Sequence, residues 1–278
     1  MHLADILVVV RGGGDLGTGV AHRLHRSGFT VMVTELPRPL VVRRAVAFAE
    51  AVYAGSIEVE GVTARLADDP MAGMAYSVLE EIPVVVDEAG DVISRMQPRI
   101  VVDARLAKRP LDTRRQDAPL VIGLGPGFTA GKDCHAVVET NRGHHLGRVY
   151  WEGSAEPDTG RPEAVQGVAG ERVLRAPVAG VFQGRCAIGN SVRAGDVLAD
   201  VSGQSILASF DGVVRGLLHD GLEVSAGLKV GDLDPRGVRD YCFLISDKAR
   251  AIGGGVLEAL LAGLPLWQLE PPPERDPF

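Results

Sequence analysis

The hydrophobic positions of the first 35 residues fall into two short runs separated by an amphipathic stretch. Ile6–Val10 is a β-branched run of the length typical of a fully buried parallel strand. A glycine-rich turn follows, and Thr18–Ser27 then carries apolar residues at helical spacing. Phe29–Thr34 is the second buried-strand run. This order of strand, glycine turn, helix and strand predicts the opening half of a Rossmann-like, doubly wound parallel sheet in an α/β fold.

Further apolar runs continue the α/β pattern as far as residue 151. One predicted helix, Val41–Val52, has Arg43 and Arg44 on its exposed face. The other predicted segments are strands at Pro83–Val86, Ile100–Val102 and Pro119–Ile122, a helix at Asp68–Glu81, and an extended stretch at Ile57–Leu66.

A polar connector leads to a segment that repeats itself at an offset of 32 residues. Ala176–Val201 aligns with Ala208–Leu233, and Gly180, Gly184, Gly189 and Gly195 fall on Gly212, Gly216, Gly221 and Gly227. Two strand-and-turn copies are too few for a solenoid, so they should close on each other. The repeat therefore predicts a second, all-β barrel-sandwich domain, built as a sandwich or a flattened barrel. Its central turn, Ser202–Ser205, lacks the lysine that covalent lipoyl or biotinyl attachment requires.

A C-terminal helix is predicted at Asp247–Leu261, with Ser246 as its N-cap. Gly253–Gly255 within it would cost about 2–3 kcal/mol relative to alanines, so something must require the missing side chains. The predicted organisation is a Rossmann-like nucleotide- or cofactor-binding domain at 1–150, a barrel-sandwich domain at 151–240, and a C-terminal helix and tail at 241–278.

The first glycine turn carries the strongest chemical signal. Gly12, Gly14 and Gly17 have the GxGxxG spacing between a buried strand and a helix. Glycines let the backbone approach a pyrophosphate, and a helix N-terminus offers unpaired N–H groups. Glu35, at the end of the next strand, would accept hydrogen bonds from ribose hydroxyls. The turn predicts a nucleotide or another small phosphorylated ligand, and a tight turn without a ligand is the alternative.

Two charged residues beside the turn could shape this site. Asp15 places a carboxylate near the expected phosphate, where it would cap the helix or hold a metal or a water. Arg38 lies between two prolines just after Glu35, and a stiff loop could aim it at a 2′-phosphate. A solvated Arg38 is the alternative, and this residue does not separate NADP from NAD.

Candidate reactive groups lie further along the chain. Asp103 follows a predicted strand at the carboxyl edge of the sheet, where open α/β sheets commonly bind ligands. An ion pair with Arg105 is the alternative role for Asp103. Cys134 next to His135 could be a thiolate able to hold sulfur, selenium or a metal, and a buried apolar Cys134 is the alternative. The spacing fits no standard zinc motif. The surrounding loop adds the candidate ligand-binding residues Gly125, Gly127, Asn141, Arg142 and His144.

Composition limits the partners. The formal net charge is −7, which argues against a general grip on nucleic acid. Three cysteines without a CxxC pair, no secretory signal and no membrane-length apolar run lead us to expect a cytoplasmic protein that does not bind a membrane. Its oligomeric state stays open, a homo-oligomer included.

The segments GGGDLGTGVAHRLHRSGF, GLGPGFTAG, ETNRGHHLGRV, APVAGV and AIGGGVLEA occur in this order, and with them the chain resembles the YqeB-type proteins. These are accessory proteins of the selenium-dependent molybdenum hydroxylase system. The resemblance implies a role in maturation of such a hydroxylase, with the enzyme or its maturation machinery as the partner. The architecture that it implies is a Rossmann-like domain joined to a barrel similar to lipoyl or biotinyl domains. The resemblance indicates a pathway and does not define a reaction.

Three functional hypotheses follow. The first is a maturation factor that binds a nucleotide or the pyrophosphate-bearing molybdenum cofactor (molybdopterin). The second is an NAD(P)-dependent oxidoreductase that uses Glu35 for ribose and His135 or His144 as acid/base. The third is a non-catalytic scaffold that docks on the hydroxylase. Whether the protein is an enzyme stays open at this stage.

Overall fold

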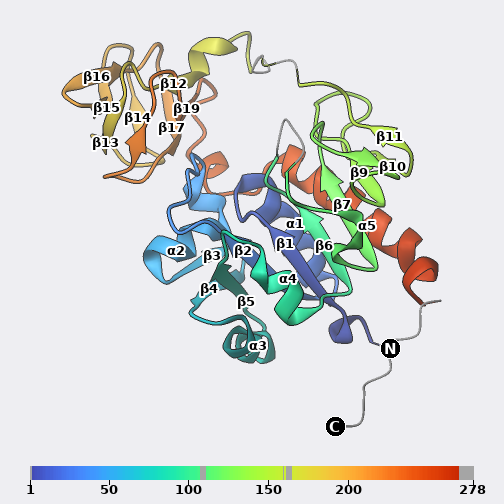
Figure 1. Cartoon of the computed structure of the whole chain (residues 1–278). Helices are drawn as coiled ribbons and strands as arrows, with labels where there is room; N and C mark the ends of the chain where they lie inside the picture. The colour runs from blue at the N-terminus through green and yellow to red at the C-terminus, as the bar shows by residue number, and fades with distance from the viewer. Residues whose placement is uncertain (1, 107–110, 159, 161–164, 269–278) are drawn as a thin grey trace.

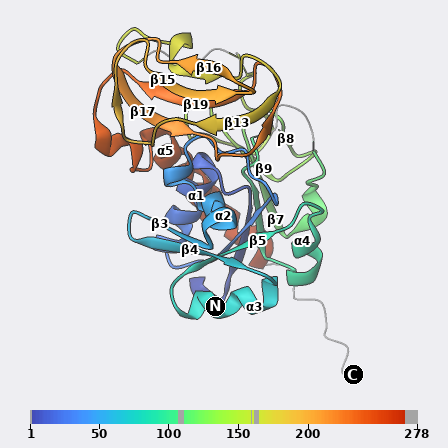
Figure 2. The same cartoon turned by 90° about the vertical axis from the view of Figure 1, so that its left-hand side faces the viewer.

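The computed structural model describes residues 2–106, 111–158, 160 and 165–268. It is a mixed α/β structure with one large sheet and smaller antiparallel sheets. Figures 1 and 2 show the two four-stranded sheets as a separate lobe beside the large sheet and its helices. We call residues 173–234 the repeat unit, and residues 2–156 together with the C-terminal helix the large-sheet unit.

The large sheet has nine strands, most of them parallel. Their bounds are β1 Leu7–Arg11, β2 Thr30–Glu35, β3 Ser56–Val59, β4 Val62–Ala67, β5 Ile82–Val86, β6 Ile100–Asp103, β7 Leu120–Leu124, β9 Ala136–Val138 and β10 Val149–Tyr150. The order is β10-β9-β7-β6-β1-β2-β5-β4-β3, with β10 and β3 antiparallel to their neighbours. A two-stranded sheet of β8 (Thr129–Ala130) and β11 (Gly153–Ser154) lies nearby. The strands predicted from short β-branched runs are confirmed, because these runs fill the buried centre of the sheet.

The helices are α1 Asp15–Arg26, α2 Ala51–Ala54, α3 Pro70–Val78, α4 Asp91–Met96 and α5 Asp247–Gln268. The helix predicted at Val41–Val52 is wrong: the segment forms two 3₁₀ turns and the short α2. Its backbone bonds are taken by other elements, since the Phe48 N–H donates to Thr18 Oγ1 and the Ala49 N–H to the Gly13 carbonyl. Arg43, predicted to be exposed, is only 7% exposed.

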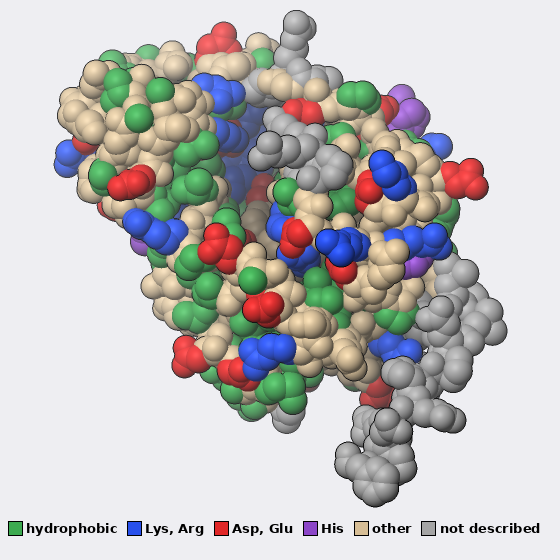
Figure 3. All heavy atoms as spheres, viewed as in Figure 1, with side chains coloured by type: hydrophobic (Ala, Val, Ile, Leu, Met, Phe, Trp, Pro, Cys, Tyr) green, Lys and Arg blue, Asp and Glu red, His purple; other side chains and the backbone are tan. Residues whose placement is uncertain are grey.

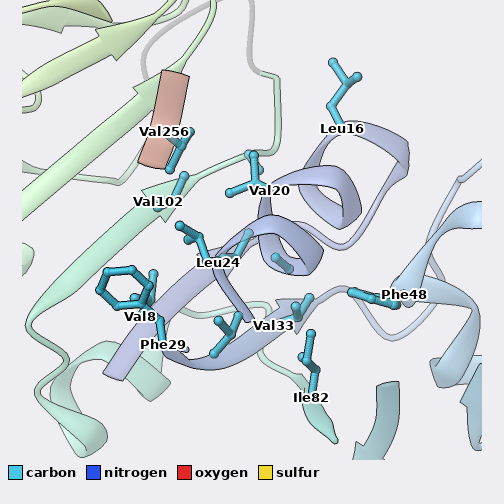
Figure 4. Close-up of a cluster of buried hydrophobic side chains, with 14 of the residues drawn as sticks. Val8, Leu16, Val20, Leu24, Phe29, Val33, Phe48, Ile82, Val102 and Val256 are labelled. Atoms are coloured by element: carbon cyan, nitrogen blue, oxygen red, sulfur yellow. The ribbon is translucent and has the colours of Figure 1, made fainter. Parts of the chain in front are cut away.

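Helices α1 and α5 pack closely, side by side and in parallel. Figure 4 shows Val20 and Leu24 of α1 pointing toward Val102 of the sheet and Val256 of α5. The glycine triplet permits this contact: a Cβ at Gly253 would lie 2.8 Å from the Gly19 carbonyl oxygen. At Gly255 a Cβ would lie 2.0 Å from the Gly147 carbonyl oxygen. The sequence predicts that something requires side chains to be absent at Gly253–Gly255. The structure shows that the reason is close backbone packing.

The repeat unit consists of two four-stranded antiparallel sheets around one apolar core. Their strands are β12 Val173–Arg175, β13 Gly180–Gly184, β14 Ser191–Val192, β15 Val197–Val201, β16 Gln204–Leu207, β17 Gly212–Leu217, β18 Glu223–Val224 and β19 Lys229–Asp234. The orders are β12-β19-β17-β14 and β16-β15-β13-β18. The pairing obeys the predicted offset of 32: Gly180 pairs with Val224, and Gly212 pairs with Val192.

Several contacts fix the repeat unit on the large-sheet unit. Arg44 Nε donates to the Leu217 carbonyl at 3.2 Å, and Tyr53 stacks on His219 with the ring centroids 4.2 Å apart. Arg38, a predicted ligand contact, instead donates to the Gly221 carbonyl at 2.8 Å. Among the described residues, no helix has the length and apolar character needed to cross a bilayer.

Candidate functional site

The glycine turn between β1 and α1 is tight. Gly12 has a φ of +98°, and a Cβ at Gly17 would lie 2.0 Å from the Gly12 carbonyl oxygen. Glu35 Oε2 accepts the Gly13 N–H at 2.8 Å, and Oε1 accepts the Leu36 N–H. Burial raises the pKa of Glu35, although these two hydrogen bonds act in the opposite direction. Glu35 therefore holds the turn itself together.

The N-terminus of α1 has no side-chain cap, because Gly14 occupies the N-cap position. Asp15 in the first turn forms an ion pair with Arg43 at 2.9 Å. Thr18, one turn on, donates its N–H to the Gly14 carbonyl. Asp15 and Leu16 line a cleft, so the helix N-terminus opens onto a cavity.

This cleft lies between the large-sheet unit and the repeat unit and has a volume of about 550 Å³. Figure 3 shows it as a deep hollow with basic side chains inside. Basic side chains outnumber acidic ones in its lining, although the chain as a whole is acidic. The basic residues are Arg43, Arg142, Arg172, Arg215, Lys229, Arg236 and Lys248, and the acidic residues are Asp15, Glu156, Asp158, Asp232 and Asp247.

Among the described basic side chains of the cleft, Arg215 is the one whose positive charge is least compensated. Its side chain is 13% exposed, and its nearest carboxylates, Asp232 and Asp234, are 3.7 and 3.8 Å away, beyond hydrogen-bond distance. The buried Nε atoms of Arg215 and Arg43 have no hydrogen-bond partner among the described residues. Burial, followed by the nearby positive charge of Arg43, lowers the pKa of Arg215. An anion bound here would supply what is missing.

Lys229 contributes a second cation from the same sheet. Its Nζ lies 4.0 Å from Asp232, and its side chain is 44% exposed. Burial lowers the pKa of Lys229, and the charges of Arg172 and Arg215 act in the same direction. Asp232 thus lies within 4.0 Å of three cations, Arg172, Arg215 and Lys229.

The N-terminus of α5 faces the same cleft. Ser246, Asp247 and Lys248 line it, and Arg142 forms a two-pronged ion pair with Asp247 at 2.5 and 2.8 Å. The hydrogen bond from Arg142 is the main cause of the lowered pKa of Asp247. Two packed helices thus present their positive dipole ends to one cavity.

Thr140, Asn141 and Arg142 form another part of the cleft lining. Glu139 is fully buried and accepts the N–H groups of Thr140, Asn141 and Glu156. It thereby fixes a loop that brings Asn141 and Arg142 to the cleft. The predicted residue His144 is exposed and outside the cleft lining.

The second glycine turn supports this loop. Gly125 donates its N–H to the Val138 carbonyl at 3.0 Å, and Gly127 is buried. Pro126, between the two, lines the cleft. The turn therefore shapes the wall of the cavity.

Cys134 and His135 do not join the cleft. Cys134 is fully buried among Val101, Phe128 and Val137, and burial raises its pKa to about 12. This environment opposes the predicted thiolate and matches the alternative of an apolar cysteine. His135 Nδ1 accepts the Val121 N–H at 2.9 Å and borders a different, open cavity.

Asp103 is also outside the cleft. It is fully buried and accepts hydrogen bonds from Thr113 Oγ1 at 2.6 Å and Arg105 Nη2 at 2.5 Å. Arg11 lies opposite Asp103 on β1 and donates to Thr113 and Asp112. Asp103 therefore forms the ion pair with Arg105 that was the predicted alternative. This pair is part of a larger polar network.

The sequence reasoning missed Arg43, Arg172, Arg215 and Lys229 as site residues. Strand pairing within the repeat unit brings Arg172, Arg215 and Lys229 together around Asp232. Arg43 joins them in the cleft where the repeat unit packs on the large-sheet unit. One signal was available in the aligned repeat copies, where Arg215 and Lys229 stand against Gln183 and Val197.

The fold and the cleft together define a two-unit α/β protein with a basic cavity between its units. No protein-family model matches the chain. The chain is 52% identical over 255 residues to "Uncharacterized protein YqeB" of Escherichia coli (strain K12), across 92% of its own length and 47% of that protein. The chain is thus similar to that curated relative and spans about half of its length.

Two solved structures give weaker matches. An aspartoacylase family protein of Mesorhizobium loti is 13% identical, with 82% of this chain and 84% of that chain covered and a TM-score of 0.25. The E. coli tRNA N6-threonylcarbamoyladenosine dehydratase TcdA, in complex with AMP, is 12% identical, with 95% and 89% covered and a TM-score of 0.32. We draw no inference from TM-scores this low.

Proposed function

We propose that this chain is an accessory protein for maturation of a selenium-dependent molybdenum hydroxylase. In this role it binds a nucleotide or the pyrophosphate-bearing molybdenum cofactor in the cleft between its units. The observation that carries the binding proposal is Arg215, a nearly buried guanidinium without a hydrogen bond to any described residue, in a cavity onto which an uncapped helix N-terminus opens.

The groups in the cleft suit a phosphorylated ligand. Backbone amides at the N-terminus of α1 and the guanidinium groups of Arg43 and Arg215 are donors that phosphate oxygens accept well. A positive cavity in a protein with a net charge of −7 also concentrates anions locally. The residues present therefore fit a pyrophosphate group, whether it belongs to a nucleotide or to molybdopterin.

The proposed fold follows from the same elements. The strand β1, the glycine turn and α1 at the centre of a mainly parallel sheet support a Rossmann-like unit. The two repeated sheets support a barrel-sandwich unit of the lipoyl or biotinyl type. In this proposal the second unit forms a wall of the binding site and carries no covalent group.

The pathway in this proposal rests on the motif resemblance. Partners in it would be the hydroxylase or its maturation machinery, and a cytoplasmic setting suits the three free cysteines. An NAD(P)-dependent oxidoreductase is less well supported, because both carboxylate oxygens of Glu35, the expected ribose contact, already accept backbone N–H groups.

The test is mass spectrometry of small molecules released by denaturing the purified native protein. We expect a phosphorylated pterin or a nucleotide in stoichiometric amount. Fluorescence titration with NADH is the control for the rival activity, since tight binding with turnover would favour an oxidoreductase. Release of no phosphorylated compound, together with no binding of added pyrophosphate, would contradict the proposal.

A further inference from the structure

The two sheets of the repeat unit differ in charge at equivalent positions. Arg215 on β17 corresponds to Gln183 on β13, and Lys229 on β19 corresponds to Val197 on β15. The pairing confirms the correspondence: Arg175 pairs with Lys229 as Leu207 pairs with Val197. We call β12-β19-β17-β14 the cleft-facing sheet and β16-β15-β13-β18 the outer sheet. Because the outer sheet folds with neutral residues at these positions, the fold itself does not require the cations.

Both sheets have an aspartate at one equivalent position, and its charged neighbours differ between the sheets. Asp200 of the outer sheet forms a short ion pair with Arg185, at 2.5 Å. Its equivalent, Asp232, has Arg172 at 3.4 Å, Arg215 at 3.7 Å and Lys229 at 4.0 Å. Three cations therefore gather around Asp232, whereas Arg185 lies beside Asp200.

These cations lie close to the expected phosphate position at α1. The charges of Arg215 and Lys229 interact with Asp15, which begins that helix, and Arg215 also interacts with Arg43 of the large-sheet unit. All four residues line the one cleft. An anion between them would contact both units at once.

We propose that the cleft-facing sheet of the repeat unit, through Arg215 and Lys229, binds a second phosphoryl group of the ligand whose first phosphoryl group lies at the N-terminus of α1. This inference rests on the proposed function and narrows it to ligands with at least two phosphoryl groups. The repeat unit is then a phosphoryl-binding wall, which gives a use to a module that has no attachment lysine.

The test compares orthophosphate with pyrophosphate by isothermal titration calorimetry of the full chain at constant ionic strength. The variant R215Q/K229V installs the residues of the outer sheet, and R215Q alone is a milder form should the double variant not fold. The matched control is Q183R, which adds a cation to the outer sheet. Thermal melts establish that each variant is folded.

We expect the native chain to bind pyrophosphate at least about tenfold more tightly than orthophosphate, since the second phosphoryl group adds charge-assisted contacts. In R215Q/K229V this ratio should fall to about threefold or less, while Q183R should match the native chain. An unchanged ratio in R215Q/K229V and R215Q would overturn the inference and leave the proposed function standing. Failure of the native chain to bind either anion would overturn both.

Discussion

At the scale of single residues, we propose that the charge of Arg215 serves ligand binding and lowers the stability of the ligand-free protein. Burial and the proximity of Arg43 disfavour its charged form. Replacing it with glutamine removes this repulsion and keeps a polar side chain of similar length. We expect Arg215→Gln to raise the free energy of unfolding of the ligand-free protein by on the order of 0.5–2 kcal/mol.

Urea denaturation followed by circular dichroism measures this change. Arg185→Gln is the matched control, because Arg185 already has a carboxylate partner, Asp200, at the surface of the same unit. The control should leave stability nearly unchanged. A clear loss of stability in Arg215→Gln would mean that Asp232 and Asp234 need this guanidinium and that its charge is a structural one.

Cys134 leads to a prediction about chemical reactivity. Its pKa of about 12 lies far above neutral pH, so at pH 8 only about one molecule in ten thousand carries the reactive thiolate. We therefore expect iodoacetamide to leave Cys134 unmodified in the folded protein and to alkylate it fully in urea. Peptide mass spectrometry reads this out, with half-buried Cys186 as the internal comparison. Rapid native alkylation of Cys134 would revive the thiolate interpretation.

At the scale of elements, the packing of α1 against α5 decides where two helix N-termini lie. Gly255 allows the approach of α5 to the Gly147 carbonyl. Gly255→Ala should destabilise the protein by about 1–3 kcal/mol, because the added methyl group overpacks a backbone contact. Gly254→Ala is the control, since a Cβ there meets nothing within 4 Å and alanine favours the helix by up to about 1 kcal/mol.

Differential scanning calorimetry of the two variants checks the packing argument. The melting temperature should fall for Gly255→Ala and stay level or rise for Gly254→Ala. Equal effects of the two substitutions would show that the glycine triplet is not a packing device.

The elements also show how local patterns succeed or fail. The strands at β1, β2, β6 and β7 were predictable because each is buried by its own sheet neighbours, and a β-branched run marks such a strand in sequence. The helix expected at Val41–Val52 failed because its backbone groups bond to Thr18 and Gly13. Those partners are remote in sequence, so helical periodicity could not reveal them.

At the scale of the whole molecule, a ligand in the cleft would join the two units. Pyrophosphate at about a hundred times its dissociation constant should stabilise the native state by about 2.7 kcal/mol. We expect one melting transition that moves upward with pyrophosphate concentration, and a smaller shift for R215Q/K229V. Sodium chloride at matched ionic strength is the control. A shift of equal size in salt alone would indicate general screening of charge.

The sequence by itself determined the order of buried strands, the glycine turn before α1 and the repeat at an offset of 32 residues. It also indicated that side chains must be absent at Gly253–Gly255. These features depend on neighbours along the chain or on a regular period, so local patterns encode them. Only the tertiary structure decided that Cys134 and Asp103 are buried away from the cleft and that Arg43, Arg215 and Lys229 line it. The physical reason is that burial and charge compensation depend on which distant segments meet, within the large-sheet unit for Cys134 and Asp103 and between the two units for the cleft.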